Sequence, residues 1–197
     1  MSDNQKIDNT RRNLVVATSV LGGAASLGAA IPFVASMLPS ERTKAAGAPV
    51  EVDISSLAPG ELKVFEWRGK PVWVIRRTRE MVESLKATAS RLTDPGSSDS
   101  QQPEYAKNEY RSLKPELMVM EGVCTHLGCS PQMKTAEAKA EMGADWAGGF
   151  YCACHGSKFD LAGRVFRGAP APTNLTVPPH AFLSDSTLLI GEDKKGA

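Results

Sequence analysis

The chain has 197 residues, which is enough for one domain of ordinary size and an additional segment. Its 23 lysines and arginines nearly balance its 22 acidic residues, so the formal net charge is +1 and nothing points to a nucleic-acid partner. Its 4 cysteines and 3 histidines are therefore more informative than its charge.

The first apolar segment, residues 14–38, carries no charged side chain. As a helix it would extend about 37 Å, which exceeds a hydrocarbon core of about 30 Å. We predict a single transmembrane anchor over 14–38 after a cytoplasmic segment 1–13, and we expect Pro32 to kink the helix or end its regular part.

The alternative to a retained anchor is a cleaved secretory signal. Such signals have an apolar core of roughly 7 to 15 residues, which favours a retained anchor, although the alanines near Ala46 leave cleavage open.

Two arginines, Arg11 and Arg12, stand directly before the apolar segment. The sequence 10–15 resembles a twin-arginine export signal, a route that carries folded proteins. Plain positive-inside topology would produce the same pair, so the motif does not decide between the two. Residues 39–50 are small and polar with Gly and Pro, and we predict a linker there with helix-forming potential but no core face.

The sequence after residue 50 favours β structure. Runs of β-type residues predict strands at 51–54, 62–67, 71–76, 117–120 and 187–190. A turn at 68–70 would join the second and third strands as a hairpin, and a further hairpin is predicted over 159–166 with its turn near Gly163. We therefore predict a mainly β, antiparallel fold.

Short helices are predicted in two places. Residues 78–87 gather apolar side chains on one face, with Thr78 as a candidate N-cap. Residues 134–142 favour a brief helix within an insertion, 134–148, whose role the sequence does not reveal. The polar segment 92–104 is typical of a loop.

All the cysteines and two of the histidines lie in two short segments. We call residues 124–129 (CTHLGC) the first box and residues 152–157 (CACHGS) the second box. Each box offers a thiolate and an imidazole on one loop, and two Cys with two His match the ligand count of a tetrahedral zinc site. The remaining cysteines, Cys129 and Cys154, would come close enough for a disulfide if the loops folded together, which the sequence alone cannot prove.

The two boxes resemble those of Rieske iron-sulfur proteins of the cytochrome bc1 and b6f type, in which two histidines replace two cysteines on one iron of a 2Fe-2S cluster. The resemblance implies these roles: Cys124 and Cys152 bind the inner iron, His126 and His155 bind the outer iron, and Cys129 forms a loop-linking disulfide with Cys154. A structural zinc site and two plain disulfides are the alternatives, and two disulfides would leave the histidine positions unexplained. His180 lies outside both boxes and is predicted to be an ordinary loop histidine.

Further features of the chain match the family or depart from it. Ser157 matches a serine whose hydroxyl bonds a bridging sulfide, and the alternative role is a turn cap. Residues 168–172 resemble the proline loop that covers the cluster, and the alternative is a rigid surface turn. Phe159 departs from the tyrosine found in many high-potential members, so we expect a somewhat lower reduction potential.

The resemblance implies a hinge at 39–50 and a Rieske domain at 51–197, with a cluster-binding subdomain at about 118–173. It implies the iron-sulfur subunit of the cytochrome bc1 complex, in which His155 contacts ubiquinol at the outer quinol-oxidation site. The cluster would take one electron with a proton and pass the electron to cytochrome c1, contributing to proton translocation in the respiratory chain. The implied partners are cytochrome b, cytochrome c1 and membrane lipid in a dimeric complex of the bacterial inner membrane.

Two other functions are compatible with the boxes. A small Rieske subunit of a periplasmic oxidase, such as arsenite oxidase, would carry the same cluster, and a stable association with cytochrome b would argue against it. A membrane-anchored protein with a structural metal or disulfide site would be colourless when purified. The predicted periplasmic side of the soluble domain rests mainly on the expected disulfide, because disulfides persist outside the cytoplasm.

Overall fold

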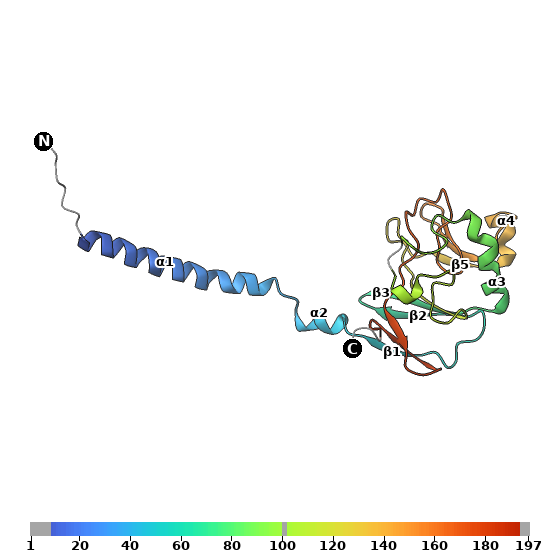
Figure 1. The fold of residues 1–197 in the computed structure, drawn as a ribbon, viewed down its shortest axis with the longest axis horizontal. Helices are drawn as coiled ribbons and strands as arrows, with labels where there is room; N and C mark the ends of the chain where they lie inside the picture. The colour runs from blue at the N-terminus through green and yellow to red at the C-terminus, as the bar shows by residue number, and fades with distance from the viewer. Residues whose placement is uncertain (1–8, 100–101, 194–197) are drawn as a thin grey trace. The chain divides into compact units, whose positions relative to one another are not determined.

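The computed structural model describes residues 9–99 and 102–193 (Figure 1). The chain forms two compact units, Met1–Ala45 and Ala46–Ala197, and each is described by itself. Residues 1–8 of the predicted cytoplasmic segment, residues 100–101 of the predicted loop and residues 194–197 lie outside the described residues.

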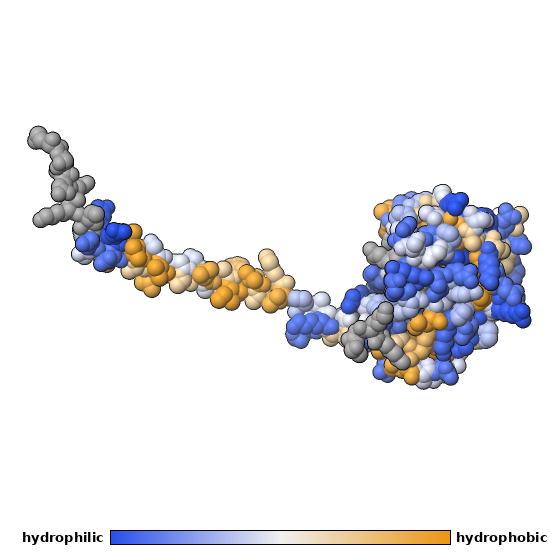
Figure 2. Space-filling model, viewed as in Figure 1, coloured by the Kyte–Doolittle hydropathy of each residue, from blue (hydrophilic) through white to orange (hydrophobic). Residues whose placement is uncertain are grey.

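A long helix, α1 (Asn9–Ser36), makes up most of the first unit. Within the described residues it is the one helix long and apolar enough to cross a membrane. Figure 2 shows hydrophobic residues along it and hydrophilic residues at its N-terminal end. The helix begins before the uncharged segment because arginine is a good helix former. Pro32 lies inside the helix and does not end it, since the helix continues to Ser36.

The small polar residues of α1 satisfy their hydroxyl groups within the helix. Thr18 Oγ1 donates to the carbonyl of Leu14 at 2.9 Å, and Ser26 Oγ donates to the carbonyl of Gly22 at 2.8 Å. A hydroxyl without a partner is costly in hydrocarbon, so these bonds make Thr and Ser compatible with a span.

A second, short helix, α2 (Glu41–Ala46), occupies part of the predicted linker. The amide of Thr43 donates to Ser40 Oγ at 3.2 Å, which satisfies one free donor of the first turn. Lys44 and Glu41 form an exposed ion pair at 2.7 Å. The helix matches the expected helix-forming potential of this linker.

The described part of the second unit contains three-stranded antiparallel sheets. Their strand orders are β1 (Val50–Asp53), β9 (Thr187–Ile190), β8 (His180–Phe182); β2 (Leu62–Trp67), β3 (Lys70–Arg76), β4 (Leu117–Glu121); and β5 (Gln132–Lys134), β6 (Gly149–Cys152), β7 (Ser157–Phe159). The prediction of a mainly β, antiparallel fold is confirmed. The strands β5, β6 and β8 were not predicted, and of β7 only Phe159 lies in the predicted hairpin 159–166.

The β2–β3 hairpin forms where the sequence predicts it. Its turn consists of Arg68 and Gly69, with φ angles of 54° and 70°. Two consecutive positive φ angles are the signature of a two-residue turn whose twist matches that of the flanking strands. Lys70, predicted as part of the turn, instead pairs with Trp67 as the first residue of β3.

The strand β4 is buried on both faces. Met118 and Met120 face a core that also contains Cys124, whereas Leu117 and Val119 face a second core. Burial on both faces explains why this strand is a continuous apolar run without alternation. The strand leads directly into the first box and fixes its position.

The helix α3 (Arg79–Thr88) is capped as predicted, because the amide of Met81 donates to Thr78 Oγ1 at 3.3 Å. Single 3-10 turns follow at η1 (Ala89–Arg91) and η2 (Glu104–Ala106). The predicted helix 134–142 is divided into a 3-10 turn, η3 (Ala136–Ala138), and a short helix, α4 (Lys139–Met142), while residue 134 belongs to β5.

Two local predictions are wrong in part. The turn at Gly163 is present with φ of 70°, but Val165 makes only an isolated bridge to Phe159, and β7 pairs with β6 instead.

His180 is not a loop residue: it begins β8 and is 1% exposed. The surrounding prolines suggested a loop, whereas burial against Tyr105 places the histidine in a core.

His180 makes the stability of the second unit depend on pH. Its Nδ1 lies 2.9 Å from the carbonyl of Pro178, which can only accept, so Nδ1 carries the proton. Nε2 is buried without a hydrogen-bond partner among the described residues. Burial lowers the pKa of His180, against smaller opposing effects of the Pro178 carbonyl and Asp193.

We expect the free energy of unfolding to fall as the pH drops below about 6.5, because the unfolded histidine then binds a proton that the buried one rejects. The slope due to this residue should not exceed about 1.4 kcal/mol per pH unit. Urea unfolding of the full chain in detergent, with His180→Gln for comparison, measures it. Identical pH dependence in the two proteins would contradict the assignment.

A group of buried ionic side chains lies next to the third sheet: Arg77, Arg111, Arg164 and Asp160 are each at most 2% exposed. Asp160 directly follows β7 and pairs with Arg164 at 2.7 Å. The guanidinium groups donate to the main-chain carbonyls of Leu85, Pro95, Tyr110, Pro115, Ala162 and Leu175. These bonds connect α3 with the loops behind the second box.

Candidate metal centre

The two boxes are loops of the same construction. In the first box, the amide of Gly128 donates to the carbonyl of Cys124 at 3.0 Å, and in the second the amide of Gly156 donates to the carbonyl of Cys152 at 2.9 Å. Gly128 and Gly156 have φ angles of 84° and 80°, a conformation that favours glycine. Each loop therefore turns back on its first cysteine and holds it inside.

A disulfide joins the loops. It connects Cys129 with Cys154, whose Cα atoms are 6.7 Å apart. The amide of Cys124 also donates to the carbonyl of Cys129 at 2.7 Å. The first box is thereby closed on itself and tied to the second.

The thiols and imidazoles lie on opposite sides of the site. Cys124 and Cys152 are free thiols that are buried in the same core. The rings of His126 and His155 stand perpendicular with centroids 4.7 Å apart; His126 is half-buried and His155 is exposed. The thiols are therefore shielded from solvent, whereas the imidazoles are at least partly accessible to it.

The surroundings of Cys152 favour its neutral thiol in the metal-free chain. Burial raises its pKa, and the neighbouring Cys124 adds to this, while the amides of Cys154 and His155 act in the opposite direction. Metal binding requires thiolates, so the same two amides would stabilise a bound, deprotonated Cys152.

The donor set fits a metal group held between the loops. The sulfurs of Cys129, Cys152 and Cys154 lie within 4.8 Å of one another. Because Cys129 and Cys154 form the disulfide, they are not thiolate donors. This leaves Cys124 and Cys152 as buried soft donors, and the half-buried His126 and the exposed His155 as nitrogen donors. Two soft and two borderline donors suit either one zinc ion or two iron atoms of a Rieske cluster.

Comparison with known proteins decides between these groups. The family model of the Rieske 2Fe-2S domain matches residues 50–179, which include every residue of both boxes. A subunit named ubiquinol-cytochrome c reductase iron-sulfur subunit, from Allochromatium vinosum, is 56% identical over 95% of this chain and 90% of its own length. The chain belongs to the iron-sulfur subunits of ubiquinol-cytochrome c reductase.

Further similarities are found among family models, curated relatives and solved structures. The model of the ubiquitinol-cytochrome C reductase Fe-S subunit TAT signal matches residues 1–40. The Blastochloris viridis iron-sulfur subunit of the same name is 40% identical over 97% of this chain and 98% of its own length. A chain of a hyperthermophilic respiratory Complex III has a TM-score of 0.47 and 26% identity, covering 88% of this chain and 98% of that chain.

As a member of the cytochrome bc1 complex, this Rieske subunit is anchored to the membrane through the N-terminal helix that carries its export signal. Its cofactor is the Rieske 2Fe-2S cluster. A Rieske cluster takes two thiolate and two imidazole ligands, which is the number of donors that the two boxes offer.

The loop 168–172 of this Rieske subunit is attached to both boxes. The amide of Ala171 donates to Ser157 Oγ at 3.0 Å, and Thr125 Oγ1 donates to the carbonyl of Thr173 at 2.7 Å. Ser157 is fully buried, and because its oxygen acts as the acceptor here, its hydroxyl proton remains available to a group held between the boxes. The sequence analysis missed Thr125, although its place between Cys124 and His126 could have drawn attention to it.

Gly122 is a further residue that the sequence analysis missed. A Cβ at this position would lie 2.2 Å from Trp73 Cε2. Trp73 in turn stacks on Phe150 with ring centroids 4.9 Å apart, in the core that holds both free thiols. Glycine therefore permits the close approach of β4 to the indole just before the first box.

Proposed function

We propose that Cys124, His126, Cys152 and His155 hold the cluster and that His155 contacts ubiquinol at the outer quinol-oxidation site of cytochrome b. The observation that carries the proposal is a pair of perpendicular imidazoles, one half-buried and one exposed, together with two buried free thiols. Leu127, next to His126 in the chain, is 70% exposed and offers an apolar surface beside the imidazoles. An exposed apolar side chain next to a polar contact suits a quinol.

A bound 2Fe-2S cluster with two imidazole ligands supplies one-electron redox chemistry at a raised potential. The residues of the chain bind the proton that leaves the quinol. One nitrogen of His155 would face the cluster, and the other, without its own proton, would accept a hydrogen bond from a quinol hydroxyl. As the quinol gives up one electron, its O–H bond breaks and an N–H bond forms on His155. The hydroxyl of Ser157 would donate a hydrogen bond to a sulfur of the bound cluster.

The proposed partners follow from this reaction. The chain would pass its electron to cytochrome c1 while cytochrome b receives the second electron of the quinol, in a dimeric complex of the bacterial inner membrane. Support for a periplasmic soluble unit comes from the disulfide, since such bonds persist outside the cytoplasm, and from the match to an export signal. We propose the segment 39–50 as the hinge between anchor and soluble domain.

A potentiometric titration of native membranes across pH tests the proposal, with the electron paramagnetic resonance signal as the readout. We expect a mixed Cys/His signal that ascorbate reduces. Its midpoint should fall at alkaline pH by up to about 59 mV per pH unit for each proton coupled to the electron. The variant His180→Gln is the control, because His180 lies outside both boxes and should leave this slope unchanged. A signal that needs dithionite and ignores pH would refute quinol oxidation.

Phe159 offers a second test of the cluster environment. Its ring is fully buried in the core that contains Cys124 and Cys152. Phe159→Tyr would add a hydroxyl able to bond a cysteine sulfur, and one hydrogen bond of about 1 kcal/mol in favour of the reduced form corresponds to roughly 40 mV. We therefore expect the midpoint to rise. Phe166→Tyr, outside the boxes, should leave the midpoint unchanged, and an unchanged midpoint in Phe159→Tyr would refute the role of the missing hydroxyl.

A further inference from the structure

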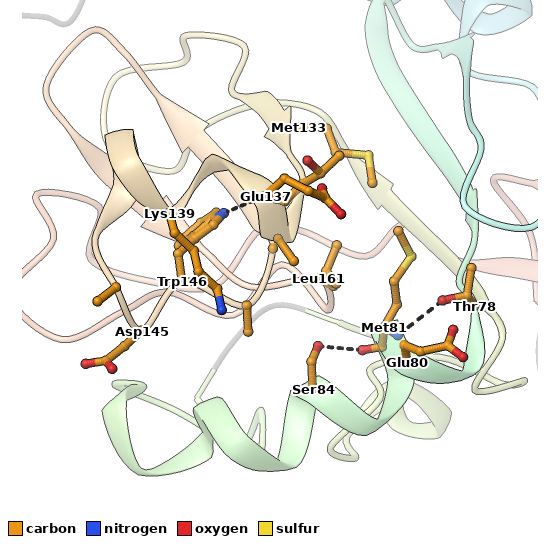
Figure 3. Close-up of a pocket in the computed structure, with 15 residues that line it drawn as sticks. Thr78, Glu80, Met81, Ser84, Met133, Glu137, Lys139, Asp145, Trp146 and Leu161 are labelled. Atoms are coloured by element: carbon orange, nitrogen blue, oxygen red, sulfur yellow. Dashed lines mark hydrogen bonds between the residues drawn. The ribbon is translucent and has the colours of Figure 1, made fainter.

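A groove separates α3 from the segment between the two boxes (Figure 3). Its volume is about 500 Å³, and residues on both sides of it belong to the second unit. None of the residues that line it belongs to either box, so the proposed quinol oxidation leaves the groove without a role.

The floor of the groove is apolar and adaptable. Met81, Met133 and Leu161 belong to one small hydrophobic cluster, with both methionines only partly buried. Methionine side chains adjust to the shape of a bound group. The indole nitrogen of Trp146 donates to the carbonyl of Thr135 at 3.0 Å, so this ring presents apolar surface to the groove.

The wall beside the methionines is acidic. In Figure 3 Glu137 lies beside Met133 and Glu80 lies beside Met81, and both glutamates are exposed. A hydrogen bond from its own amide, followed by one from Thr78, lowers the pKa of Glu80. The side chain of Thr135, followed by its own amide, lowers the pKa of Glu137. Both carboxylates are therefore firmly ionised and held beside the apolar floor.

Other charged residues line the groove or lie next to it. Lys139 is the basic residue among those that line it, and Asp145 lies 4.0 Å from Arg91. An adjoining open pocket shares Asp145 and Trp146 with the groove and is also lined by Arg91, Lys158 and Arg167. The basic pocket thus adjoins the groove at Asp145, whereas Glu80 and Glu137 are not among the residues that line that pocket.

The groove is also preformed. Trp146 bonds to Thr135 and so joins the two ends of the insertion to each other, while Lys158 Nζ donates to the carbonyl of Met142 in its middle at 2.7 Å. A rigid site loses little conformational entropy on binding, which favours a specific contact.

We propose that this groove docks a segment of a partner protein that presents an apolar side chain flanked by lysine or arginine. The apolar side chain packs on Met81, Met133 and Leu161, and the cation lies between Glu80 and Glu137. Charge complementarity identifies the occupant, because the carboxylates repel an acidic segment and the basic pocket beyond Asp145 repels a cation placed at the far end. The docking surface lies outside the metal centre and does not depend on the redox reaction.

Photo-crosslinking in native membranes tests the proposal. The exposed Ala144 is replaced by p-benzoylphenylalanine in the full chain, and the adduct is sequenced by mass spectrometry. The same experiment is repeated with Glu80→Gln and Glu137→Gln together. The matched control carries Glu83→Gln and Glu141→Gln, which neutralise one carboxylate on α3 and one on α4 outside the groove.

We expect an adduct with another polypeptide, at a segment where lysine or arginine flanks an apolar residue. The yield should fall about three- to ten-fold in the Glu80/Glu137 variant and stay unchanged in the control. An adduct with lipid, with a second copy of this chain or with a segment lacking basic residues would overturn the proposal. So would the absence of an adduct, or a yield that ignores the charge change. The resonance signal of the cluster, measured in each variant, reports separately on the proposed function.

Discussion

Asp160→Asn should lower the free energy of unfolding by about 3 to 5 kcal/mol, which is the cost of leaving a buried charge without its partner. Asp160 and Arg164 are each 1% exposed. The carboxylate accepts from the Nε and NH2 groups of Arg164 at 2.8 and 2.7 Å and from the amides of Ala162 and Arg164 at 2.9 and 2.8 Å. The side-chain amide of asparagine could accept only some of these hydrogen bonds, and it carries no negative charge.

Neighbouring cations increase the expected effect. Burial lowers the pKa of Arg77 and that of Arg111 to about 10, and the charge of Asp160 opposes this shift in both. Without the carboxylate, three guanidinium groups would remain buried in one region with less compensation. The loops they connect would be the first to loosen.

Urea unfolding of the full chain in detergent measures the effect of Asp160→Asn. The matched control is Asp185→Asn, which removes an aspartate that is fully exposed and lies 3.2 Å from Lys114. An exposed ion pair contributes little, so this control should unfold like the parent. Equal losses in the two variants would show that burial of Asp160 does not determine its contribution.

Removing the disulfide is the other change with a large expected effect. The double variant Cys129→Ser, Cys154→Ser should lower the free energy of unfolding by about 3 to 4 kcal/mol, because the bond closes a loop with a sequence separation of 25 residues. Both boxes should also separate more readily under oxidising conditions. The cluster should therefore be lost faster, as measured by the decay of its resonance signal.

The single variant Cys129→Ser serves as a comparison. It leaves a thiol at Cys154, whose sulfur lies within 4.8 Å of that of Cys152, and this thiol can compete for metal or form a wrong disulfide. We expect the single variant to lose its cluster at least as fast as the double variant. If the cluster of either variant is as stable as that of the parent under oxidising conditions, the disulfide does not hold the site together.

The sequence predicts the parts of the fold that depend on local pattern. The β2–β3 hairpin follows from two apolar runs around Arg68 and Gly69, and the α3 cap follows from Thr78. The spacing of Cys and His within each box limits the possible donors in the same way. These features need only a few neighbouring residues to be recognised.

Features that depend on distant partners were not predictable in this way. The strands β5 and β7 are three residues long and exist because β6 lies between them. Buried arginines cannot be distinguished from surface arginines by sequence, since only the folded loops supply the carbonyls that make their burial tolerable. His180 was assigned to a loop because its partner, Tyr105, lies far away in the chain.

The proline-rich loop is attached once to each box, through Thr125 to the carbonyl of Thr173 and through Ser157 to the amide of Ala171. The disulfide joins the boxes to each other. These three links form a closed ring of supports, so that loosening any one of them also weakens the other two. The cover and both boxes should consequently open in an all-or-none manner, and solvent would reach the sulfur side only when the whole tip comes apart.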